Sequence, residues 1–252
     1  MDALKRSLIE KAGNEQGWEL VVTSNETGVV LASSRHKAQI RITQQTPHQT
    51  WLVTVPTGLI CQELTRSFPD AFQKESTFMA VGWDHLAHLL RRTAELALSL
   101  PDQAALTYAE RVEKEIAKIQ DCTTEVERLV KQRIGQDTFR EALMDYWGRS
   151  CSVTGLNMPE VLRASHAKPW AKCESDEERL DVFNGLLLCA NLDALFDRGM
   201  ITFDAGGRII CSLRITPEQQ SMLHIHDTMT LRWVAPEHVP YLAWHRDHVF
   251  LA

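Results

Sequence analysis

Three short pieces between residues 150 and 212 decide the fold of the C-terminal half: RASHAKPW at 163–170, NGLLLC at 184–189 and DALFDRG at 193–199. The first is typical of an extended segment that ends in a histidine, and the second is an apolar run of strand length. In the third, Asp193 and Asp197 are four residues apart and share one face of a helix. The pieces predict strand, loop, strand and helix, with a histidine, an asparagine and two carboxylates brought together.

Two flanking motifs extend this pattern. CSVTG at 151–155 precedes the histidine strand, and FDRG at 196–199 ends the helix. Over residues 126–212 the sequence resembles the HNH endonucleases, which have a ββα-metal fold. The resemblance maps the family's first histidine onto His166 and its central asparagine onto Asn184. It maps the third position, nine residues further on, onto Asp193.

The resemblance implies a role for each of these residues. Cleavage of a phosphodiester needs an activated water, a cation on the phosphate and stabilisation of the departing oxygen. His166 would be the general base, because a histidine can take the proton of water near neutral pH. Asn184 would anchor the loop that carries His166, and Asp193 would bind the metal with Asp197 as a second candidate ligand. Oxygen ligands favour Mg²⁺ or Mn²⁺ over Zn²⁺ or Ni²⁺, whereas Ser165 stands where many members have an acid or a histidine.

Each residue also has a structural interpretation. His166 alone could be a polar residue at a strand end, and Asn184 followed by a glycine could form a turn. Asp193 could be a solvated helix charge, and Asp197 could pair with Arg198. The conjunction of separated motifs favours the nuclease interpretation.

A DNA substrate requires a local basic surface, because the net charge of −6 disfavours general binding of nucleic acid. The candidate phosphate contacts are Lys168, Arg198 and Arg140. Arg140 lies in GQDTFR at 135–140, which is similar to an element that precedes the nuclease core in many bacterial HNH proteins. Helix packing would explain this segment equally well. Basic residues that could supply the surface, with acidic residues interleaved, are Arg128, Lys131, Arg133, Arg140, Arg149, Arg163, Lys168 and Lys172.

The whole chain is predicted to be α+β, with an N-terminal module over 1–100, a helical connector over 101–135 and a nuclease domain with a C-terminal extension over 136–252. The module is expected to be an antiparallel meander with helices on one face. Its segments are a helix over 2–12 that ends at Gly13, strands over 18–23, 29–33, 38–43 and 51–55, a turn over 44–48, and helices over 56–66 and 83–97. Nothing in it indicates a catalytic site, and it could bind a small ligand, a protein regulator or DNA.

The connector is predicted to end at Gly135, with a new helix capped by Asp137. After the nuclease core we expect a hairpin around residues 205–207, a helix start at 216–218, a strand over 228–234 and a last helix over 236–248. Five histidines in this region are expected at the surface, since no metal-ligand spacing repeats: His224, His226, His238, His245 and His248.

Composition is that of a soluble cytoplasmic protein, with scattered cysteines, no secretory signal and no membrane span. The leading hypothesis is a divalent-metal-dependent DNA endonuclease with a role in restriction or phage defence. The alternative is a nucleic-acid-binding or sensing protein with a degenerate, weakly active or inactive HNH core. A homodimer is plausible, because cutting both strands with single-site nucleases usually needs two copies.

Overall fold

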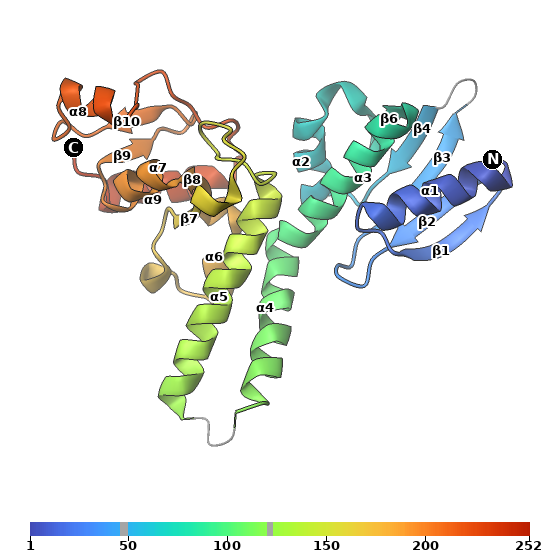
Figure 1. Cartoon of the computed structure of the whole chain (residues 1–252), viewed down its shortest axis with the longest axis horizontal. Coiled ribbons are helices and arrows are strands. Elements are labelled where there is room, and N and C mark those ends of the chain that lie inside the picture. Colours follow the sequence, from blue (N-terminus) through green and yellow to red (C-terminus); the bar gives the residue numbers. More distant parts are fainter. Residues whose placement is uncertain (46–49, 120–122) are drawn as a thin grey trace. The chain divides into compact units, whose positions relative to one another are not determined.

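The computed structural model describes residues 1–45, 50–119 and 123–252, and it divides into two compact units, 1–103 and 104–252 (Figure 1). Most of the turn expected over 44–48 lies outside the described residues, as does Cys122. In the part that is described, no helix combines the length and apolar character needed to cross a membrane.

The first unit is built on a six-stranded antiparallel sheet with the order β1-β2-β3-β4-β6-β5. Its strands are β1 (Leu20–Asn25), β2 (Gly28–Ala32), β3 (Gln39–Gln45), β4 (Thr50–Thr54), β5 (Phe72–Lys74) and β6 (Thr77–Val81). Its helices are α1 (Ala3–Glu15), α2 (Leu59–Ser67) and α3 (Gly82–Ser99). The predicted meander is therefore confirmed, and β5 and β6 extend it.

One face of this sheet is buried because alternate residues of neighbouring strands are apolar and in register. Ile42 lies opposite Val29 on β2 and Val53 on β4, and all three are fully buried. Helices α1 and α3 pack on the sheet (Figure 1). The prediction that α1 ends at Gly13 is wrong, because the helix continues to Glu15. Gly13 is buried where a Cβ would overlap the Leu31 side chain, so close packing selects glycine there.

Helices α4 (Pro101–Ile116) and α5 (Thr124–Tyr146) follow. The predicted helix break at Gly135 is wrong, and so is the cap at Asp137, since α5 runs through both. Glycine is needed at 135 because a Cβ there would overlap the Trp170 ring. The cost of a glycine inside a helix, about 1 kcal/mol, is offset by this close packing.

The predicted strand, loop, strand and helix are present over residues 162–197. Strand β7 (Leu162–His166) pairs antiparallel with β8 (Gly185–Cys189), and α7 (Ala190–Asp197) follows at once. A short helix, α6 (Asp176–Leu180), lies in the loop between the strands, together with a 3-10 turn at Trp170–Lys172. All five residues of β8 are buried, as expected for an apolar strand covered on both faces.

The C-terminal extension packs around this core. The predicted hairpin is formed by β9 (Ile201–Phe203) and β10 (Ile209–Cys211), and it is followed by α8 (Pro217–Met222) and α9 (His238–His248). No strand forms over 228–234, although Thr230 makes an isolated bridge to Arg208. The expectation of surface histidines is wrong for His238 and His245, whose relative exposures are 0% and 1%.

Candidate active site

His166 stands at the end of β7, opposite Gly185, the first residue of β8. Its ring stacks on Phe139 of α5 with a centroid separation of 3.7 Å. Gly185 makes room for this, because a Cβ there would lie 2.5 Å from Phe139 Cζ. The glycine after Asn184 is therefore a packing requirement of the strand that faces the histidine, and not only a turn residue.

One hydrogen bond fixes the tautomer of His166. Its Nε2 lies 2.8 Å from the Arg179 carbonyl oxygen, which can only accept, so Nε2 carries the hydrogen. In the neutral ring Nδ1 then holds the lone pair, and it makes no hydrogen bond within the described part of the chain. Burial lowers the pKa of His166 to about 4, although the bond to Arg179 acts in the opposite direction. The imidazole is therefore neutral at pH 7 and can accept a proton at Nδ1.

His166 lines a pocket of about 310 Å³ that residues from several elements enclose. Asp197 comes from the end of α7, His245 and Val249 come from α9 and its C-terminal end, and Trp170 comes from the loop after β7. Among the described residues, Asp197 rather than Asp193 shares this pocket with His166. The hairpin, the loop, α7 and α9 thus converge on the histidine.

Asp193 is held beside the pocket by the residue next to the histidine. Successive strand residues point to opposite faces, so Ser165 turns toward α7 while His166 turns toward α5. The Ser165 hydroxyl donates to Asp193 Oδ1 at 2.6 Å. Desolvation, and then the negative charge of Asp193, raises the pKa of Asp197 to about 6, and Arg198 opposes the shift. The two carboxylates are therefore close enough to repel each other.

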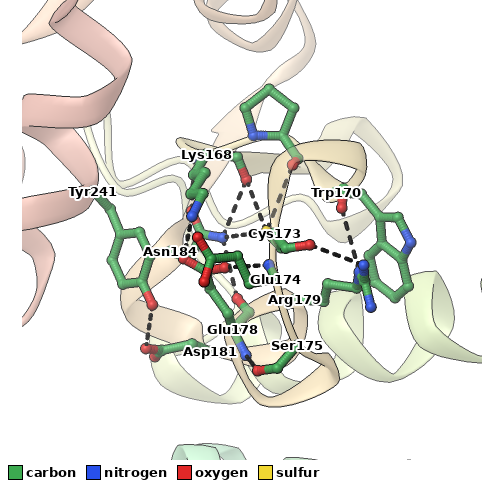
Figure 2. Close-up of polar contacts among 11 residues, drawn as sticks. Lys168, Trp170, Cys173, Glu174, Ser175, Glu178, Arg179, Asp181, Asn184 and Tyr241 are labelled. Atoms are coloured by element: carbon green, nitrogen blue, oxygen red, sulfur yellow. Dashed lines mark hydrogen bonds and ion pairs between the residues drawn. The ribbon is translucent and has the colours of Figure 1, made fainter. Parts of the chain in front are cut away.

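Asn184 ties the loop between β7 and β8 to its own start (Figure 2). The side chain is fully buried. Its oxygen accepts from the Lys168 amide at 2.8 Å, and its nitrogen donates to the carbonyls of Lys168 at 3.1 Å and Glu178 at 3.2 Å. The backbone two residues after His166 is therefore fixed to the backbone next to Arg179, whose carbonyl orients the imidazole.

Comparison with known families gives one match that bears on this geometry: a model described as HNH endonuclease matches residues 151–204. The segment belongs to the HNH endonuclease family. A comparison with curated proteins finds no match. The matched residues contain both strands of the hairpin, the loop and α7. His166, Asn184, Asp193 and Asp197 therefore all lie within the matched segment.

The three predicted phosphate contacts of the HNH domain and its flank differ in availability. Lys168 Nζ forms an ion pair with Glu178 at 2.7 Å (Figure 2). Arg140 donates to the carbonyls of Leu162 at 2.7 Å and Pro159 at 2.9 Å, which fixes the start of β7 against α5. Arg198 is exposed and makes no hydrogen bond or ion pair within the described residues. Of the three, Arg198 alone has a cationic group that is free of such contacts within the described residues.

The Cys-x-x-Thr-Gly motif at the start of the HNH segment is a turn. Cys151 Sγ accepts from the Thr154 amide at 3.4 Å, and the Gly155 amide donates to the Cys151 carbonyl at 3.0 Å with a φ of +72°. Cys151 Sγ also lies 3.9 Å from Cys189 Sγ, at the junction of β8 and α7. The motif thus packs the entry to the domain against the helix that carries both aspartates.

Sequence reasoning missed two contributors to the site. His245 stacks on Phe196 of α7 at 3.8 Å, receives the Thr202 hydroxyl at Nδ1 and donates from Nε2 to the Phe196 carbonyl. Arg179 acts through its backbone carbonyl, which no side-chain pattern reveals. A signal for His245 in the sequence is its spacing three residues after Leu242, which places both side chains on one face of α9.

Proposed function

We propose that the chain is a divalent-metal-dependent endonuclease that hydrolyses DNA phosphodiester bonds, with His166 as the general base. The observation that carries this proposal is the bond from His166 Nε2 to the Arg179 carbonyl, which leaves the lone pair on Nδ1. A bound phosphate would raise the low pKa of His166 toward neutral, where transfer of a proton from water is most effective.

The donor set fits a hard divalent cation. Asp193 and Asp197 offer carboxylates on one helix face, and Ser165 adds a hydroxyl that already contacts Asp193. Desolvation and then the charge of Asp193 raise the pKa of Asp197, and a cation bound between the two carboxylates would relieve their repulsion. When bound, a Mg²⁺ or Mn²⁺ ion would stabilise charge on the phosphate and on the leaving oxygen. In the described residues no three His, Cys, Asp or Glu side chains are grouped to hold a metal, so water and phosphate must complete the shell.

The other side chains support proton transfer. Asn184 holds the loop so that the Arg179 carbonyl meets Nε2, and this keeps Nδ1 as the basic atom. Arg198, exposed at the end of α7, is suited to contact the phosphate. We assign Arg140 to positioning of β7, since its guanidinium already serves two backbone carbonyls.

Incubation of supercoiled plasmid with Mg²⁺, Mn²⁺ or Zn²⁺ tests this function. We expect nicking with Mg²⁺ or Mn²⁺ that stops with a chelator, and we expect Asp197→Asn to need a higher metal concentration for the same rate. DNA binding without cleavage in any of the three metals would contradict the proposal and support the degenerate-core alternative. That alternative is favoured by the small number of metal ligands.

A role in restriction or phage defence is an extension of the same proposal. It rests on the resemblance of the layout to bacterial HNH proteins. Expression of the wild type and of His166→Ala in cells challenged with phage would test it, because protection that persists in the variant could not come from cleavage.

A further inference from the structure

A second and larger pocket, of about 610 Å³, lies in the unit 104–252 and involves helices outside the matched HNH segment. Its walls are α4, the N-terminal half of α5, and the loop segment that includes Trp170 and α6. We call it the α4–α5 groove. Its volume falls in the range of pockets that hold a small ligand, so it is large enough for nucleotides of one strand.

Trp170 connects this groove with the active-site pocket, because its side chain lines both. The ring is held in place from three directions. Its tip packs against Gly135 of α5, the Arg179 guanidinium lies over it at 5.7 Å from the ring centroid, and His166 meets it edge-on at 5.9 Å. A ligand in the groove that contacts Trp170 is therefore adjacent to the proposed general base.

The cationic side chains of the groove outnumber its carboxylates. Lys131 pairs with Glu127 at 2.6 Å, and Arg179 pairs with Asp176 at 2.8 Å. Arg128 lines the groove and makes no ion pair or hydrogen bond with any residue that the structure describes. The carboxylates of Glu127 and Asp176 are therefore neutralised by ion pairs inside the groove, and the guanidinium of Arg128 is left without a pair among the described residues. Tyr108, whose side chain is largely buried, provides a second aromatic wall.

We propose that the α4–α5 groove binds an unpaired stretch of the nucleic-acid strand that leads to the scissile phosphate. Arg128 would contact its phosphates, and a base would stack on Trp170. Stacking of a base on an aromatic side chain contributes about 1–3 kcal/mol and works for any base. The proposal rests on the proposed function and adds a substrate class: strands with a single-stranded or distorted flank beside the cut.

Fluorescence anisotropy with a labelled single strand of about 12 nucleotides tests the groove. The measurement uses full-length His166→Ala protein in a chelator, so that it does not depend on cleavage. We expect Arg128→Glu to weaken single-strand binding by at least about tenfold and to lower the salt slope by about 0.7, because one lost phosphate contact removes about 0.7. Arg133→Glu is the matched control: it is exposed on the same helix but does not line the groove.

Equal effects of the groove variant and of Arg133→Glu would overturn the proposal, because they would show a diffuse charge effect. A loss confined to blunt duplex DNA would overturn the choice of an unpaired strand. Groove-dependent binding by a chain that cleaves nothing in any metal would contradict the proposed function and leave the groove assignment intact. If the groove variant changed neither cleavage nor single-strand binding, the groove assignment would be contradicted and the proposed function would remain.

Discussion

Replacement of Asn184 by alanine should open the loop that orients His166. The change removes one acceptor for the Lys168 amide and one donor to each of three groups, the carbonyls of Lys168 and Glu178 and the Cys173 thiol, all at a fully buried position. A net hydrogen bond contributes about 0.5–1.5 kcal/mol, and a buried group left without a partner costs about 1–3 kcal/mol. We therefore expect local opening of the loop to become easier by about 3 kcal/mol, which is about a hundredfold in the opening equilibrium.

The Cys173 thiol reports this opening. It is buried, with 4% relative exposure, and its Sγ lies 3.4 Å from the Lys168 carbonyl inside the same loop. Modification of the native protein by a thiol reagent, followed by peptide mass mapping, measures how often the loop opens. We expect Cys173 to react about a hundredfold faster in Asn184→Ala.

The matched control is Asn191→Ala, because Asn191 is exposed on α7 and its side chain makes one hydrogen bond within the described residues, at 3.3 Å to the Leu223 carbonyl. Its Cys173 reactivity should equal that of the wild type. If Cys173 in Asn184→Ala also reacted at the wild-type rate, the loop would not depend on Asn184, and its role as an anchor would be refuted.

Three further changes separate packing from chemistry. Gly135→Ala should lower the free energy of unfolding, because the alanine Cβ would overlap Trp170, although alanine has the better helix propensity. A midpoint of urea unfolding equal to or above that of the wild type would contradict this prediction. Arg140→Gln should lose up to about 3 kcal/mol of stability, because two hydrogen bonds from a charged group are removed. Its DNA affinity should depend on salt concentration as steeply as that of the wild type. A dependence weaker by about one phosphate contact would show that Arg140 contacts DNA. Burial lowers the pKa of His245 from 6.5 to about 4, so the stability that neutral His245 contributes is present above pH 6.5 and is lost as pH falls toward 4. The free energy of unfolding in urea should therefore fall between pH 7 and pH 5 by about 2 kcal/mol less in His245→Gln than in the wild type. An equal fall in both proteins would refute the pKa shift.

The nuclease core could be predicted from sequence because its information is local. An apolar run of strand length, an asparagine before it and two aspartates four residues apart after it indicate β8 and α7, and the structure has both elements. The antiparallel pairing of β7 with β8 spans the long connection of residues 167–184, so it could not be read from loop length, and it agrees with the ββα fold that the resemblance implies. The position of Asn184 at the loop also agrees with the resemblance.

The remaining features depend on partners that are distant along the chain. Gly135 has the propensity of a helix end, and only its packing against Trp170 explains why α5 continues. His245 is buried because Thr202 and the Phe196 carbonyl satisfy its ring nitrogens. Asp197 enters the His166 pocket while Asp193 is held by Ser165, a difference that their shared helical face does not reveal.

The most direct measurement of the central claim is the rate at which His166→Ala nicks supercoiled DNA with saturating Mn²⁺, compared with His226→Ala. His226 is an exposed histidine of the same unit and serves as the matched control. If Nδ1 of His166 takes the proton of the attacking water, the first variant should lose about 10²–10⁴-fold in rate, and the second should keep the wild-type rate. Nicking by His166→Ala at the wild-type rate would contradict the account.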